Sequence, residues 1–152
     1  MARYTITEEE VDFVRKLFDT KFTQKDIPDA IIESGLVLEE ATDYAYQRVL
    51  LHFPDLTYSD NVDGFITASL QEPITSLFKR SILYRLAGNI APSLNRIVSE
   101  SGGNVSLAID TPDWREFQTH CYRIAIEQLQ QIDSILNQTT PVSLNYDLFS
   151  VS

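Results

Sequence analysis

Residues 74–94 read ITSLFKRSILYRLAGNIAPSL, and this stretch decides the fold. Its apolar residues recur at steps of three and four, the spacing that places them on one face of an α-helix. They are Ile74, Leu77, Phe78, Ile82, Leu86, Ile90 and Leu94, and Leu83, Tyr84, Ala87 and Ala91 widen the stripe. A helix that is apolar over so much of its circumference is typical of the inside of a bundle. The stretch therefore predicts a central helix, with Pro73 in its first turn and Pro92 at its end.

The charge of this stretch is opposite to that of the rest of the chain. The 152 residues include 22 Asp and Glu against 12 Lys and Arg, a formal net charge of −10. No acidic residue lies between Pro73 and Ser99, whereas four basic residues do: Lys79, Arg80, Arg85 and Arg96. We expect such basic positions to meet acidic surface, either of this chain or of a second copy. The candidates for charge contacts between copies are Lys79, Arg80 and Arg85 on one side, and Glu39, Glu40, Asp43 and the acids of residues 8–12 on the other.

Capping residues mark the first and the last helix. Thr7 and Glu10 form a capping box that starts a helix with an acidic first turn. Thr111 and Pro112 supply a cap residue and a proline at the first helical position, so they start a last helix that runs to about residue 137. The buried stripe of this last helix is Trp114, Phe117, Cys121, Ile124, Ala125, Leu129, Ile132, Ile135 and Leu136.

The stretch between the first and the central helix predicts two further helices. A short helix starts at Pro28 and ends at Gly35. A longer helix follows over residues 36–52, with Leu51 on the flank of its apolar strip. Residues 60–64 are polar and turn-like, and residues 65–71 fit either an early turn of the central helix or a separate short piece.

Two stretches replace the helical period by alternation. Residues 96–109 predict a β-hairpin that turns at two glycines, and residues 138–152 predict an extended arm. The side chains expected to bind a partner are Pro141, Val142, Leu144, Tyr146, Leu148, Phe149 and Val151. Ordering such an arm costs more conformational entropy than burying these side chains returns. The arm is therefore either frayed or ordered by ladder hydrogen bonds, which the hairpin or the sheet edge of another subunit would supply. Its alternation favours the ordered arm over the frayed one.

Together these patterns predict a mainly α fold. It is a small bundle of four to five helices, a single domain over residues 1–137, with the hairpin inserted before the last long helix and the arm after it. The length of 152 residues suits one domain, and no apolar stretch is long and charge-free enough to span a membrane.

No residue pattern indicates an enzyme, a cofactor or a metal. His52 and His120 are the only histidines, and neither stands in a metal-binding or nucleophile motif. His120 with Cys121 would be a ligand pair only if both faced one site, whereas the periodicity places Cys121 in the buried stripe and His120 outside it. Because Cys121 is the one cysteine, no intramolecular disulfide forms and a reducing compartment is favoured.

Three phrases of the chain resemble a known family. They are IPDAIIESGLVLEEATDYAYQRVL at residues 27–50, LAGNIAPSLNRIVSESGGNVSLAID at residues 86–110, and DWREF at residues 113–117, which opens the last long helix. Their order and spacing look like those of the head-to-tail connector proteins of tailed bacteriophages, also called adaptors or head-completion proteins. The likeness covers most of residues 23–137 and rests on order and spacing, without an invariant signature.

The resemblance implies a structural protein of the virion neck, assembled in the host cytoplasm. Such proteins are small helical domains that form a ring, usually a dodecamer, under the portal protein. They extend the DNA channel toward a stopper, a tail-terminator or another tail-side protein, and carry no catalytic residues. A net charge of −10 would suit a channel through which DNA slides without binding, although solubility is its more ordinary meaning. The alternative is a small acidic helical protein that binds and regulates a host factor, with imitation of DNA as one way to do so.

Overall fold

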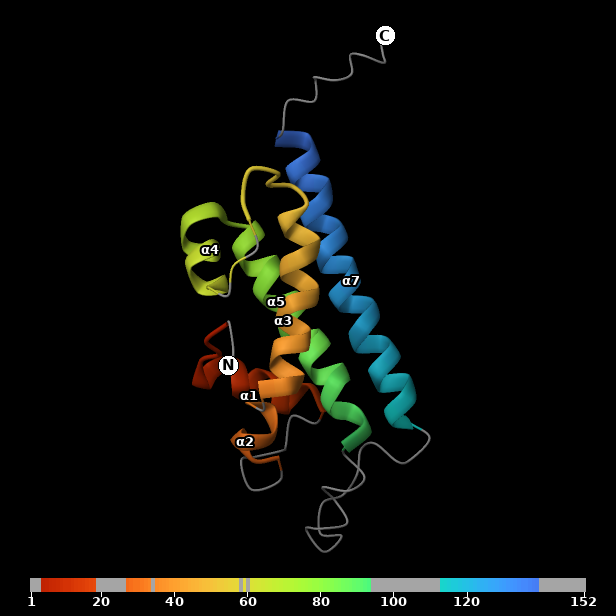
Figure 1. Cartoon of the computed structure of the whole chain (residues 1–152). Helices are drawn as coiled ribbons and strands as arrows, with labels where there is room; N and C mark the ends of the chain where they lie inside the picture. The colour runs from red at the N-terminus through yellow and green to blue at the C-terminus, as the bar shows by residue number, and fades with distance from the viewer. Residues whose placement is uncertain are drawn as a thin grey trace, which may run out of the picture.

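The computed structural model describes residues 4–18, 27–33, 35–57, 59, 61–93 and 113–139. These residues form helices α1 (Glu8–Phe18), α2 (Asp29–Ile32), α3 (Gly35–Leu50), α4 (Val62–Ser69), α5 (Ile74–Ile90) and α7 (Asp113–Thr139), with a 3-10 turn η1 (Ala91–Ser93) after α5. Helices α3, α5 and α7 run side by side, α1 and α2 lie at one end of this group, and α4 lies beside the N-terminal half of α5 (Figure 1). The prediction of a mainly helical bundle is confirmed.

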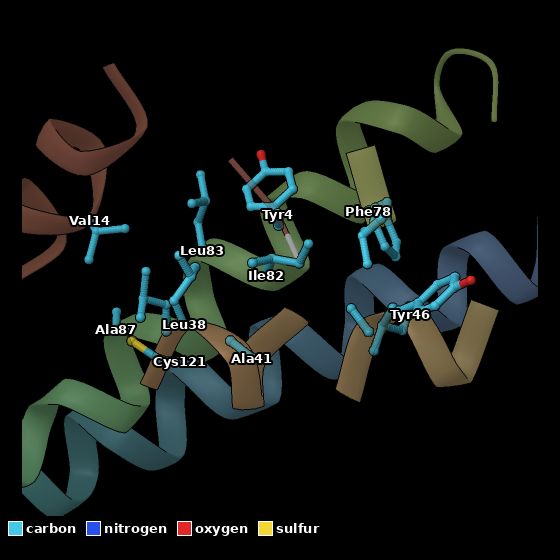
Figure 2. Packing of buried hydrophobic residues seen from close by; sticks show 14 of the residues in the cluster. Tyr4, Val14, Leu38, Ala41, Tyr46, Phe78, Ile82, Leu83, Ala87 and Cys121 are labelled. Carbon is cyan, nitrogen blue, oxygen red and sulfur yellow. The ribbon is translucent and has the colours of Figure 1, made fainter. Parts of the chain in front are cut away.

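Helix α5 is the central helix that its apolar pattern predicts. It packs against α7, α3, α1 and α2, more than any other helix does. Phe78, Ile82, Leu86 and Ile90, one face of the predicted stripe, are all buried. Figure 2 shows side chains of α5 gathered with those of α3 and with Cys121 of α7 in one cluster. The helix ends at the predicted place, because the η1 turn contains Pro92.

Helices α5 and α7 approach each other closely at a glycine. Gly88 is buried, and an added Cβ atom there would lie 2.4 Å from Cε1 and 2.7 Å from Cδ1 of Tyr122. The side chain of Gln118, one turn earlier on α7, donates a hydrogen bond to the Gly88 carbonyl at 2.9 Å. The glycine thus makes room for the aromatic ring and for a short contact between the two helices.

The N-terminal elements are held by caps and by one buried cation. The backbone amide of Glu10 donates to Thr7 Oγ1 at 3.2 Å and that of Thr7 donates to Glu10 Oε1 at 3.0 Å, which confirms the capping box. The guanidinium of Arg15 is buried between α1 and α2 and donates to the Ile27 carbonyl at 2.8 Å and to the Asp29 carboxylate. A buried cation is tolerated there because its donors have partners.

Several predicted boundaries differ from the structure. Gly35 begins α3 instead of ending the short helix, which closes at Ile32 with Glu33 after it. Residues 62–64 are the first turn of α4 rather than a loop, since the Asn61 side chain accepts from the Gly64 amide at 2.8 Å and caps this helix. Residues 65–69 therefore belong to a separate helix, which settles the choice left open for residues 65–71.

Helix α7 ends later than its pattern predicts, and the segments predicted as non-helical fall mostly outside the described residues. Helix α7 continues to Thr139, so the first two residues of the predicted arm, 138–152, are helical. No strand occurs among the residues that the structure describes. The β-hairpin predicted over residues 96–109 and the arm residues from 140 onward lie outside the described residues.

Candidate interaction surfaces

A polar network joins the three long helices at the site of one predicted charge contact. The Arg85 guanidinium on α5 makes a bidentate contact with the Glu40 carboxylate on α3, with Nε–Oε1 at 3.0 Å and Nη2–Oε2 at 2.7 Å. Asn89 Nδ2 donates to Glu40 Oε1 at 2.7 Å, and Tyr122 of α7 donates from its hydroxyl to Asn89 Oδ1 at 2.6 Å. The Arg85 guanidinium also lies 3.8 Å from the centre of the Tyr44 ring. Arg85 and Glu40 thus pair within the chain, and a contact between copies would require this pair to open.

The network sets the protonation of its charged members. Burial alone would raise the pKa of the Glu40 carboxyl, but hydrogen bonds from Arg85 and Asn89 and the charge of Arg85 outweigh burial and lower it. Burial alone would lower the pKa of the Arg85 guanidinium, yet the hydrogen bond and charge of Glu40 raise it. Burial raises the pKa of the Tyr122 hydroxyl, which stays neutral and donates. The pair is therefore ionised and links α3 to α5.

We expect the stability that Glu40 contributes to disappear in acid. Because its pKa is lower in the folded chain than the ordinary value of 4.5, the unfolded chain binds more protons as the pH falls below that value. The contribution is complete above the ordinary pKa and is lost as the pH falls through the folded pKa. The substitution Glu40→Gln should lower the free energy of unfolding by about 1 kcal/mol at neutral pH, since half-exposed pairs are screened, and by less in acid.

Urea unfolding of the unaltered chain and of the Glu40→Gln variant, at neutral and at acid pH, measures how the effect of the substitution depends on pH. The control repeats this comparison with Arg85→Met added to both proteins. Without the Arg85 cation, Glu40→Gln should lower the free energy of unfolding by less at neutral pH as well. An effect of Glu40→Gln that is equal at both pH values would contradict the assignment.

The other two predicted cations line a groove between α1 and α5. Lys79 is half-buried and Arg80 is exposed, and both face the acidic first turn of α1 across a groove of about 270 Å³. Its lining residues are Glu9, Glu10, Phe13, Ser76, Lys79, Arg80 and Leu83. Phe13 is partly exposed there and contacts the edge of the Tyr84 ring at 5.8 Å between centres. The structure thus places these cations beside the acids of residues 8–12, although neither cation forms an ion pair with another described residue.

The remaining predicted acids lie on α3. Glu39 and Asp43 are half-buried, whereas Glu40 is exposed and bonded to Arg85. None of the three is among the described residues that line the groove of Lys79 and Arg80. The predicted contact of these acids with Lys79 and Arg80 of another copy stays a prediction.

A second groove, which the sequence did not predict, follows the end of α3. We call it the apolar groove; it is lined by Gln47, Leu50, Leu51, Phe53, Pro54 and Leu56 and has a volume of about 590 Å³. Leu51 is 79% exposed and Leu56 is 44% exposed. The prediction that the helix continues to residue 52, with Leu51 on the flank of its apolar strip, is therefore wrong. The helix stops at Leu50, before Pro54, and the Phe53 amide turns back to donate to the Leu50 carbonyl at 2.9 Å. This tight turn leaves Leu51 outside the core.

The apolar groove lies at the same end of the bundle as the C-terminus of α7. Asp133 of α7 accepts a hydrogen bond from Arg48 at 3.1 Å, and its other carboxylate oxygen lies 2.8 Å from His52 Nε2. Arg48 lies in the last turn of α3 and His52 in the turn that follows it, at the end of α3 that carries the groove. Asp133 is six residues before Thr139, about 9 Å along the helix. The last described residue of α7 is therefore close to the groove (Figure 1).

Cys121 and His120 lie where the helical period of α7 predicts. Cys121 is buried, burial raises the pKa of its thiol to about 12, and His120 is exposed, as the periodicity predicts. No cluster of three metal-ligating side chains occurs within the described part of the chain. None of the described helices has the length and apolar character that crossing a membrane requires.

Comparisons with known protein families, with curated proteins and with solved structures find no match to this chain.

Proposed function

We propose that this chain is a structural subunit of the neck of a tailed bacteriophage. It forms a ring that docks on the portal protein, joins head to tail and extends the DNA channel. The observation that supports this most is a self-contained helical bundle that carries two different surface grooves, one charged and one apolar. A ring requires heterologous contacts, in which one patch of a subunit meets a different patch of the next. The order and spacing of residues 27–50, 86–110 and 113–117 add the resemblance to connector proteins.

The charge of the chain supports a role beside DNA without specific binding to it. Proteins that bind the phosphate backbone present a basic surface, whereas this chain has a net charge of −10. Lys79 and Arg80, the cations of the α1–α5 groove, face the acids of α1 and are available for a neighbouring acidic subunit. The DNA passes through the ring and is repelled by its walls.

The partners of the ring follow from its place in the particle. One face meets the portal protein, the flanks meet neighbouring copies in a ring of about twelve, and the far face meets a stopper, a tail-terminator or another tail-side protein. The extended arm, residues 138–152 in the sequence-based prediction, supplies contacts to the portal or to neighbours. We propose neither an enzymatic activity nor a cofactor for the chain.

Mass under native conditions tests this proposal. The purified chain should form a ring of uniform stoichiometry when a portal ring is added, and native mass spectrometry should detect the added mass as a multiple of 17.3 kDa. Exchange of both cations for acids, Lys79→Glu with Arg80→Glu, should weaken ring formation because acidic neighbours would then repel each other. A chain that remains monomeric beside portal rings and joins no particle would support the regulatory alternative instead.

A further inference from the structure

We propose that the apolar groove of one subunit binds residues 141–152 of a neighbouring copy. This inference rests on the proposed ring and identifies the surface that receives the arm. Three observations support it: the character of the groove, the character of the segment, and the place where the segment begins.

The apolar groove is built for an uncharged, apolar occupant. None of the six described residues that line it is charged, and five of them (Leu50, Leu51, Phe53, Pro54 and Leu56) are apolar. Its volume of about 590 Å³ lies in the range typical of binding pockets. One wall is anchored to the core, because Phe53 contacts the edge of the Phe65 ring at 5.5 Å between centres. Isolated exposed leucines are common, but a concave cluster within ten residues indicates a binding surface.

The segment has the matching composition. Residues 141–152 contain six apolar residues besides Pro141, with Val142, Leu144, Tyr146 and Leu148 at every second position. Asp147 is the one charged residue among these twelve, in a chain with 22 acidic residues. An extended peptide with this pattern presents one apolar side and brings little charge to a partner that is itself acidic.

The position of α7 brings the segment to this end of the bundle. Helix α7 ends at Thr139, close to the groove, and the thirteen residues that follow reach up to about 43 Å when extended. Neighbouring bundles of this size lie about 20–30 Å apart, since packed helices are about 10 Å across. In a ring, the same end of each bundle lies at the same level, so the segment reaches the groove of the next copy. A segment that filled its own groove would join no copies, whereas the exchanged arrangement gives the heterologous contact that a ring repeats.

A labelled peptide tests the proposal without a portal. A synthetic peptide of residues 141–152 with a fluorescent label is titrated with the full-length chain and with a chain that ends at Thr139. The shorter chain retains every described residue of the buried core, so it is expected to fold. Binding to both chains with similar affinity is expected, because the groove of a free subunit is open to a segment from outside. Binding to the shorter chain alone would show that the segment covers its own groove, and would overturn the proposal, as would binding to neither.

Two exposed leucines, one at each end of α3, provide a matched pair of variants. Leu51→Asp, in the groove, should weaken peptide binding at least tenfold. The substitution removes a leucine that the bound peptide would bury, and it places a charge in an apolar surface. Leu36→Asp, at a leucine that is 82% exposed at the other end of α3, should leave the affinity unchanged. Equal affinity of the Leu51→Asp chain and the unaltered chain would exclude this groove. Because the assay contains no portal, its failure would leave portal docking to be judged separately.

Discussion

Deletion of residues 141–152 should abolish ring formation on the portal and leave the helical bundle intact. Among the described residues, the buried members of the core cluster lie between Tyr4 and Ile132, and the partly buried residues packed against it end at Leu136. The deletion therefore removes no described packing contact. Circular dichroism and thermal unfolding of the shortened chain should match those of the full chain. Native mass spectrometry with portal rings should detect the portal alone, without added copies of the shortened chain. The loss is expected to be complete because the proposed contact is repeated between every pair of copies.

Substitutions within the segment separate its apolar side from its length. Serine at Val142, Leu144, Tyr146 and Leu148 should prevent ring formation as the deletion does. Alanine at the intervening Ser143, Asn145 and Asp147 is the matched control and should leave ring formation unchanged, because these positions lie on the opposite side of an extended chain. Rings that still form after the deletion would show that the arm has no part in assembly.

The central helix was predictable because its signal is local and redundant. Seven apolar residues of the stretch that ends at Leu94 repeat the helical spacing, so a single exception does not change the reading. The predicted helix boundaries agree less well with the structure. The capping box at Thr7 is confirmed, whereas Gly35, which the pattern predicts to end the short helix, instead begins α3. A glycine ends a helix by adopting a particular backbone conformation, which its identity alone does not specify.

The surface sites were harder to predict because they depend on which helices become neighbours. The charge inversion indicated that Arg85 would meet an acid, and Glu40 was among the candidates. The sequence alone left open whether that acid belonged to the same chain, and the packing of α3 on α5 places the two side chains together. The apolar groove was missed for a different reason. Leu51 fits the helical period, but α3 ends one residue earlier, and the turn before Pro54 leaves the side chain exposed.

The largest loss of stability is expected from Gly88→Val. A Cβ atom at this position would lie 2.4 Å from a ring carbon of Tyr122, and the ring is held in place because its hydroxyl donates to Asn89 Oδ1 at 2.6 Å. The added side chain must push α5 and α7 apart or displace the ring and break that bond. Overpacking of this kind costs about 1–3 kcal/mol, and the lost hydrogen bond about 1 kcal/mol more. We expect the free energy of unfolding, measured in urea, to fall by about 2–4 kcal/mol.

The same substitution at another helical glycine is the matched control. An added Cβ atom at Gly35 meets no atom within 4 Å, so Gly35→Val should change the free energy of unfolding by less than about 0.5 kcal/mol. Removal of the Tyr122 aromatic side chain should also restore part of the lost stability. Gly88→Val combined with Tyr122→Ala should lower the free energy of unfolding by less than the sum of the two single changes. Additive losses, or equal effects at Gly88 and Gly35, would contradict the close approach of α5 and α7. Because ring assembly requires a folded subunit, Gly88→Val should also reduce ring yield, in proportion to the fraction of chains that unfold.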